Sequence, residues 1–469
     1  MQPSKIEAIQ ANVVAFTRPT AAVAARPRTP WPDRLLPALL FVTLVLPVLV
    51  YKSAAHLSAT AGDIQATARI VDTFTAPKGA CAGAAALALA VLMMVALRAT
   101  SALPRLSPLL GTLLLAQLAL FTVSVACAPS AGDAAWGLRG HLYMLVVFVV
   151  VAGSSRGPQT AMVALVAAAV VVAAIVIAES AGWYLPGLPA ALTASLLRPT
   201  ATLNHRNVAA ALLAAATPAL LTLAMTRRQR ASFAAVAVAT AVVVAALYET
   251  SSRAAMLAAL VAVAFATARQ RWVTRRPLRL LAVAGAVVVV STLALAMPPH
   301  LPTAASGTDA IAAPPLVRDR LFDKVERVVE HRDNSARERL QLWRTSLSLI
   351  AARPLTGGGP DAFAQAWRAA HPQSPLPHAH DLWLQAGVAF GVPTMLLFAL
   401  AALAAARVAW TRAATGTPIE SAAAAAVVAF LVVGVFECVD LMMGVNLHFA
   451  AALGALVPCA AAARIGGER

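Results

Sequence analysis

Long apolar runs recur along almost the whole of this chain, and they constrain its fold more than any other feature. A composition of 60% hydrophobic and 12% charged residues is one that a water-soluble domain of 469 residues cannot bury. A bilayer admits only helices and closed barrels, and runs of about 16–25 residues suit helices. The sequence therefore predicts an all-α, polytopic membrane protein with about twelve transmembrane helices, near 35–51, 79–97, 107–127, 140–155, 160–179, 207–225, 232–248, 254–268, 279–297, 382–406, 421–440 and 446–463.

Arginines mark every second predicted loop. They precede the first span and follow the second, fourth, sixth, eighth, tenth and last, as Arg18, Arg26, Arg28, Arg34, Arg98, Arg105, Arg156, Arg227, Arg228, Arg230, Arg269, Arg271, Arg275, Arg276, Arg279, Arg407, Arg412, Arg464 and Arg469. Cytoplasmic loops carry such an excess, so both termini are predicted to be cytoplasmic. The net charge of +17 then reflects topology and contact with anionic lipids. Basic residues scattered over short loops do not form a nucleic-acid-binding face.

Four regions follow from this pattern. Residues 1–34 form a polar, disordered cytoplasmic tail, and residues 35–297 hold transmembrane helices 1–9. Residues 298–381 form a large helical loop on the outer side. Residues 382–469 hold transmembrane helices 10–12 and a short cytoplasmic tail. A loop of this length between helices is usually functional.

The large loop is predicted to contain three helices. Apolar residues recur at helical spacing over 321–329, and a second helix is expected over 335–352. The apolar stripe of the second helix is predicted to be Leu340, Trp343, Leu347 and Ile350. Pro354 and the glycines at 357–359 end this helix in a turn, and a short third helix contains Phe363 and Trp367.

The loop ends in two histidines and an aspartate, placed directly before the next span. A neutral imidazole can take a proton from a hydroxyl near physiological pH, so His380 is a candidate general base. Asp381 or a backbone carbonyl could orient its ring. His378 is two residues away, and the sequence leaves open which of the two histidines is the base.

A metal site is the competing interpretation of this cluster. His378, His380 and Asp381 are acceptable ligand types, and His371 is near in sequence. A third firm ligand is not evident. The sequence therefore favours a site that uses no cofactor, with a metal site as the less favoured alternative.

Three arginines break the positive-inside pattern because they fall at outer span ends: Arg139, Arg206 and Arg253. Guanidinium groups suit phosphate and diphosphate oxygens, so these residues could clamp an anion. A local ion pair is the alternative for Arg253, since Glu249 lies four residues before it. Carboxylates at outer span ends, namely Glu179, Glu437 and Asp440, could pair with these arginines or act in catalysis.

Three separated motifs resemble those of the bacterial O-antigen ligase and O-antigen polymerase family. Thr-Leu-Asn-His-Arg-Asn at 202–207, with Asn204 and Asn207, is similar to the family's Asn-x-x-Asn element. Thr-Ser-Ser-Arg-Ala-Ala at 250–255 is similar to its Ser-Arg element. The stretch from Arg339 through the glycines to His-Asp-Leu-Trp-Leu-Gln at 380–385 resembles its large periplasmic loop. One departure is Asp381, where the family usually has Asn or Ser.

The resemblance implies a glycosyltransferase of the bacterial inner membrane that needs no metal. Its donor would be a glycan on a polyprenyl diphosphate, and its acceptor a sugar hydroxyl of lipid A–core in a ligase, or a second lipid-linked glycan in a polymerase. His380 would be the base, and Arg206 and Arg253 would bind the diphosphate. His378, Asp381, Asn204, Asn207 and Arg139 would support the site, and the large loop would be periplasmic.

Two other classes stay open on the sequence alone. In a transporter, the same arginines would line an anion path, but a repeat between the halves is not visible and the connection between the sixth and seventh spans is short. In a non-catalytic assembly partner of the export machinery, substitutions at these positions would leave glycan products unchanged.

Overall fold

The structure is a computed structural model, and its described residues are 31–50, 78–95, 108–128, 131–181, 201–203, 206–226, 229–269, 277–296, 334–371, 378–441 and 444–457. All regular elements in these ranges are helical, which confirms the all-α class. Before the large loop the helices are α2 (Trp31–Leu49), Lys78–Val95, α4 (Pro108–Cys127), α5 (Ala131–Gly153), α6 (Gly157–Ser180), η1 (Ala201–Leu203), α8 (Arg206–Thr226), α9 (Arg230–Glu249), α10 (Arg253–Arg269) and α12 (Pro277–Ala296). From the loop onward they are α14 (Asn334–Ala352), α15 (Ala362–Ala370), α16 (Leu382–Thr415), α17 (Pro418–Gly434), η2 (Val439–Leu441) and α18 (Val445–Ala455).

Five of the described helices are long and apolar enough to cross a membrane: Lys78–Val95, α6, α8, α9 and α16. Shorter apolar helices cover Leu35–Leu49, Leu115–Cys127, Leu138–Gly153, Pro418–Gly434 and Val445–Ala455. A helix thus occupies each of the predicted spans, and five of the described helices meet the combined criterion of length and apolar composition. The multi-span character is supported, and the number of twelve crossings stays a prediction.

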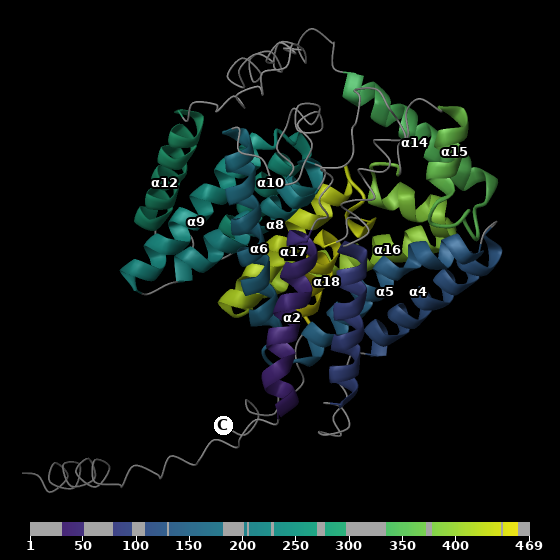
Figure 1. Ribbon diagram of the computed structural model, residues 1–469, viewed down its shortest axis with the longest axis horizontal. Helices are drawn as coiled ribbons and strands as arrows, with labels where there is room; N and C mark the ends of the chain where they lie inside the picture. The colour runs from purple at the N-terminus through teal and green to yellow at the C-terminus, as the bar shows by residue number, and fades with distance from the viewer. Residues whose placement is uncertain are drawn as a thin grey trace, which may run out of the picture.

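Helix α8 forms the centre of the bundle. An apolar stretch of 18 residues in α8 is 94% buried, whereas the corresponding stretches of the other four long helices are between 28% and 50% buried. It packs against α6, α9, α10 and α17. In Figure 1, α8 lies between α12 and α9 on one side and α4 and α5 on the other. Alanine fills much of α8, and small side chains let neighbouring helices approach it closely.

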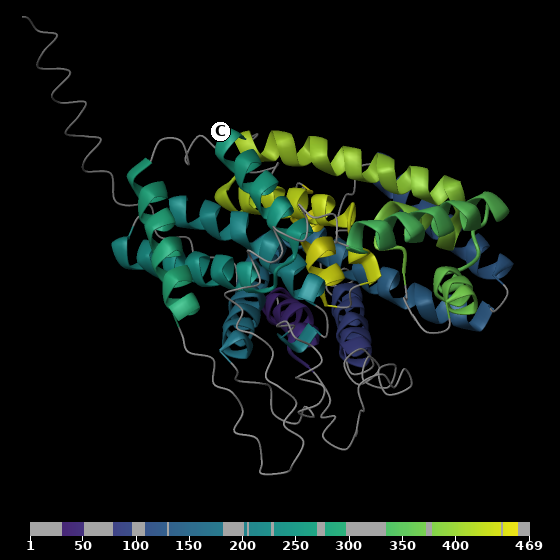
Figure 2. The ribbon, with the colours of Figure 1, turned by 90° about the horizontal axis from the view of Figure 1, so that it is seen from above.

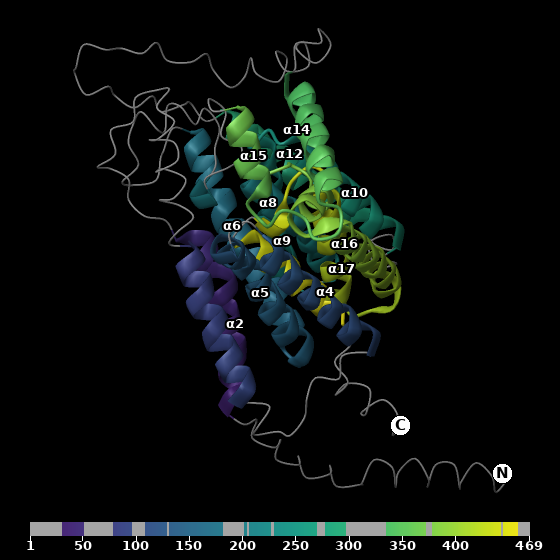
Figure 3. The same cartoon turned by 90° about the vertical axis from the view of Figure 1, so that its right-hand side faces the viewer.

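Two helices of the large loop lie among the described residues, α14 and α15. They confirm the helix predicted over 335–352 and the short helix predicted around Phe363 and Trp367. They lie at one end of the bundle (Figures 1 and 3). Their apolar side chains form a small core with the start of α16, made of Leu342, Ile350, Phe363, Trp367, Ala379 and Val388. The amphipathic helix predicted at 321–329 lies outside the described residues.

The predicted apolar stripe of α14 is partly wrong. Leu340 and Leu347 are 47% and 57% exposed, while Leu342, Ser346 and Ile350 are buried. The buried face is set by the surface of α16 that α14 meets. Ile350 lies against Gly387 of α16. A Cβ at position 387 would lie only 2.7 Å from the Cδ1 of Ile350, so this contact requires glycine there.

Helix α16 is broken at Gly391, and the glycine turn after α14 docks into the break. Figure 2 shows α16 running along one side of the bundle. Gly391 has φ 84° and ψ 171°, and its neighbour Val392 donates a hydrogen bond to the Pro354 carbonyl at 2.7 Å. Gly358 and Gly359 donate to the Val388 and Ala389 carbonyls at 2.8 and 2.9 Å, respectively. Backbone groups freed by a break in an apolar helix must find partners, and the turn supplies them.

Gly357 offers a direct test of this docking. It has φ 67°, and a Cβ there would lie 2.5 Å from backbone atoms of Ala389 and Phe390. Gly357→Ala is expected to lower the free energy of unfolding by at least about 1–2 kcal/mol, the cost of left-handed backbone alone. Thermal unfolding in detergent measures this loss.

The matched control is Gly285→Ala in α12, where an added Cβ meets nothing within 4 Å. Alanine is the better helix former, so this variant should be as stable as the wild type or slightly more stable. Equal stability of the Gly357 and Gly285 variants would contradict the docked turn.

Candidate active site

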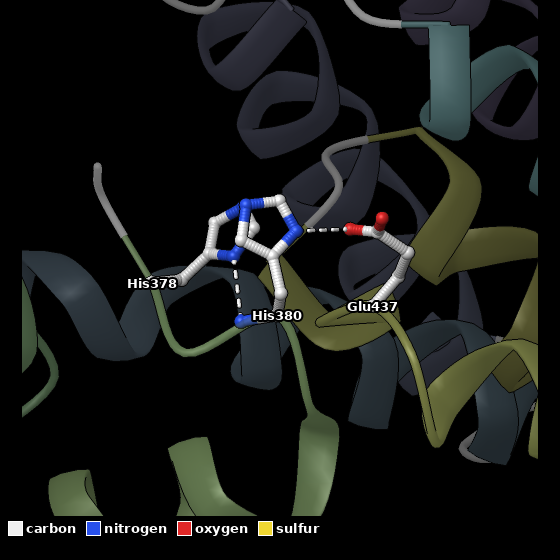
Figure 4. Close-up of side chains that lie close together, drawn as sticks. All are labelled: His378, His380 and Glu437. Atoms are coloured by element: carbon white, nitrogen blue, oxygen red, sulfur yellow. Dashed lines mark hydrogen bonds and ion pairs between the residues drawn. The ribbon is translucent and has the colours of Figure 1, made fainter. Parts of the chain in front are cut away.

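Glu437, in the turn after α17, lies at the centre of a network of side chains drawn from four segments. Its side chain is 1% exposed, and its Oε2 lies 2.9 Å from Nδ1 of His380 (Figure 4). Its Oε1 accepts a hydrogen bond from Nδ2 of Asn207 and lies 3.5 Å from Nη2 of Arg339. The start of α8, helix α14, the turn before α16 and the turn after α17 therefore meet at one carboxylate.

The Glu437 carboxylate determines which nitrogen of His380 can act as a base. An ionised carboxylate only accepts hydrogen bonds, so Nδ1 of His380 carries the hydrogen of the neutral ring. Nε2 then keeps its lone pair. The His380 side chain is 16% exposed, so a substrate hydroxyl can reach it. A buried carboxylate behind an imidazole also stabilises the positive charge that forms when the ring takes up a proton.

His380 has a left-handed backbone conformation, which is rare outside glycine. One residue at each of the motifs at 202–207 and 250–255 shares it. Among the described residues other than glycine, positive φ values occur at Ala201 (50°), Ser251 (53°) and His380 (52°). Ala201 directly precedes the motif at 202–207, and Ser251 lies inside the motif at 250–255. Such strain persists where the surrounding contacts impose it, and it gathers at functional sites.

The start of α8 is fixed by contacts to two other helices. The Ala201 amide donates to Oε2 of Glu179 at 2.8 Å, and Oγ1 of Thr202 donates to the Val48 carbonyl at the end of α2. Lys78 also caps α2, because its Nζ donates to the Val50 carbonyl at 2.6 Å. These bonds hold the segment that leads into α8. Asn204, a predicted supporting residue, lies outside the described residues.

Arg206 is the first residue of α8, directly before Asn207. Its Nη1 is buried and has no hydrogen-bond partner among the residues that the structure describes. A buried donor without a partner costs free energy, and an anionic ligand would satisfy it. The partial positive charge at the start of α8 also favours an anion at this position.

Arg253 begins α10, which packs against α8. Because α9 runs back between them, α8 and α10 start at the same end of the bundle. Arg253 is exposed, unlike Arg206. Arg139, in α5, lies against the start of the helix at Lys78–Val95, since a Cβ on Gly79 would lie 3.9 Å from its Nε.

Asp381 is one of the two groups that the sequence offers for orienting His380, and the structure gives its side chain another contact. Asp381 caps α16, where its Oδ1 accepts a hydrogen bond from the Leu384 amide at 2.8 Å. The carboxylate that contacts His380 is that of Glu437. Burial raises the pKa of the Asp381 carboxyl, and hydrogen bonds from the Leu384 and Trp383 amides oppose the shift.

Substitutions of Asp381 should distinguish the effect of its N-cap on stability from the effect of its charge. An acid with a raised pKa in the folded state loses stability as the pH rises through that pKa. Asp381→Asn keeps an N-cap without this loss, so it should be at least as stable as the wild type at pH 7, with the difference vanishing near pH 4. Asp381→Ala should lose about 1 kcal/mol. Thermal unfolding at the two pH values would show both effects, and an Asn variant as unstable as the Ala variant would contradict the capping role.

Two members of the network were not among the predicted site residues: Glu437, which the sequence offers as a carboxylate that could pair with an arginine or act in catalysis, and Arg339. Glu437 carried a signal, since a carboxylate at the end of an apolar span is usually functional. Arg339 lies in α14, and its guanidinium carbon is 5.7 Å from the ring centroid of Phe436. Its position in the large loop gave no reason to pair it with a residue near the C-terminus.

Comparison with known proteins identifies a family that part of the chain matches. Residues 238–399 match the model of the O-antigen ligase family. The matched region includes the motif at 250–255, both described helices of the large loop and His380. The chain matches no curated protein. The match over residues 238–399 supports the resemblance of this chain to the O-antigen ligase and polymerase family.

Proposed function

We propose that this protein transfers a glycan from a polyprenyl diphosphate to a sugar hydroxyl, at the outer face of the bacterial inner membrane. In this proposal the chain crosses the membrane about twelve times, both termini are cytoplasmic, and the loop at 298–381 is periplasmic. Ligation to lipid A–core is the first candidate. Polymerisation onto a second lipid-linked glycan is the other, since the matched family includes both.

His380 is the proposed general base. The acceptor oxygen bonds to the anomeric carbon of the donor glycan while its proton passes to Nε2 of His380. The bond between that carbon and the diphosphate oxygen breaks, and the polyprenyl diphosphate leaves with the electron pair. Glu437 holds the ring and stabilises the imidazolium.

Arg206 and Arg253 are the proposed diphosphate ligands. Negative charge grows on the leaving diphosphate, and guanidinium groups fixed in advance stabilise it. They supply the positive charge that a divalent cation supplies in other phosphate sites, so the proposal needs no metal. Asn207, Arg339 and His378 support this arrangement around Glu437 and His380.

One observation carries the proposal: the His380–Glu437 pair lies beside the start of α8, where Arg206 presents a buried guanidinium nitrogen without a partner among the described residues. The test is reconstitution of the purified protein with a lipid-linked glycan and either lipid A–core or a second donor. Glycan on lipid A–core indicates a ligase, and a longer lipid-linked glycan indicates a polymerase. Absence of both products would overturn the proposal.

A further inference from the structure

His378 and His380 present their rings to the same space in front of Glu437. Their ring centroids are 4.3 Å apart and the rings are tilted by 56° (Figure 4). The backbone amide of His380 lies 3.3 Å from Nδ1 of His378, which closes the turn between the two residues. The left-handed conformation of His380, with φ 52°, is part of this turn.

We propose that His378, His380 and Glu437 form an inhibitory binding site for a transition metal ion, best matched by Zn²⁺. One ligand atom from each residue lies within 4.8 Å of the other two. Tetrahedral Zn²⁺ with bonds of about 2.0–2.1 Å needs ligand atoms about 3.3 Å apart. Small side-chain rotations close the difference. Two imidazoles and a carboxylate are a common zinc ligand set, with a fourth position left for water or substrate.

Glu437 is prepared to serve as one ligand through a single oxygen. Asn207 and Arg339 contact its Oε1, whereas Oε2 faces His380. These contacts fix the carboxylate plane, as outer contacts do in metal sites. The positive charge of Arg339 opposes a cation, so binding is weaker than at a structural zinc site and depends on the free Zn²⁺ concentration.

The inhibition follows from the tautomer of His380, and it rests on the proposed function. Without metal, Nδ1 carries the hydrogen and Nε2 holds the lone pair that takes the acceptor proton. When Zn²⁺ binds Nδ1, the neutral ring keeps its hydrogen on Nε2 instead. The nitrogen that faces substrate then donates rather than accepts, and transfer stops. Removal of the ion restores the original tautomer.

The experiment measures Zn²⁺ binding and transfer separately on the purified full-length protein. Equilibrium dialysis against ZnCl₂ should show one saturable ion per chain, and X-ray absorption should show imidazole and oxygen ligands near 2.0–2.1 Å. His378→Gln and Glu437→Gln should each weaken binding at least about tenfold. The matched control is His371→Gln, because His371 stacks on Trp367 at 4.0 Å and is not among the three ligands.

The outcomes distinguish the metal site from the proposed base. Zn²⁺ should inhibit transfer over the concentration range in which it binds, and EDTA should reverse the inhibition. Binding without inhibition would support the site and overturn the role of His380 as the base. Absence of saturable binding in the wild type, or equal loss in the His371 variant, would overturn the metal site whatever the transfer assay shows.

Discussion

Replacing His380 by asparagine is expected to lower the rate of glycan transfer about 10²–10⁴-fold, the usual contribution of a general base. Asparagine tolerates the left-handed φ of 52° better than alanine does, so the backbone should stay in place. Its amide cannot take a proton from a hydroxyl. The measurement is transfer by the purified variant with a saturating lipid-linked donor.

His371→Asn is the matched control for this prediction, since His371 lies in the same loop and contacts Gln341 and Trp367. It should transfer glycan at a rate near that of the wild type. His380→Ala should give the same loss as His380→Asn, in a protein that still folds and inserts. A His380 variant with unchanged product would end the assignment of this residue as the base.

Glu437→Gln is expected to lower transfer at least about 10²-fold, because it removes the charge that holds Nδ1 of His380 in its donating form. The substitution keeps the size of the side chain. The neutral amide fixes neither the tautomer nor the imidazolium that forms during transfer. Transfer rates and thermal unfolding, measured on the same preparation, separate this effect from a loss of structure.

Glu420→Gln provides the control at the opposite end of α17. Glu420 completes the capping box with Thr417 and pairs with Arg412 at 3.0 Å. Its loss should reduce stability slightly and leave transfer nearly unchanged. If the Glu420 and Glu437 variants lose transfer equally, the effect reflects the stability of α17 and not the orientation of His380.

The helical fold follows from the sequence more fully than the details of packing do. Hydropathy places a helix in each predicted span, and the loop helices α14 and α15 follow from apolar periodicity and from Pro354. The buried face of α14 does not follow, because it depends on the surface that α16 offers at Gly387. The break at Gly391 depends likewise on a turn that lies more than thirty residues earlier in the chain.

The same division applies to the candidate site. His380 and Asn207 stand out in the sequence by residue type and position. Their common partner Glu437 lies 57 residues from His380 and 230 residues from Asn207, so only the packing of α8 against α17 reveals the network. Asp381 was paired with its neighbour His380, although an aspartate directly before an apolar helix is also typical of an N-cap.

A double-substitution cycle on the transfer rate shows whether Glu437 acts through His380. If Glu437 acts through His380, then Glu437→Gln should have little further effect once His380 is asparagine. The measurement compares the two single variants and the double variant at high enzyme concentration, so that residual transfer is detectable. The double variant is expected to be as slow as His380→Asn alone. If the two rate losses multiply in the double variant, Glu437 and His380 act independently. That result would contradict the role of Glu437 in holding His380.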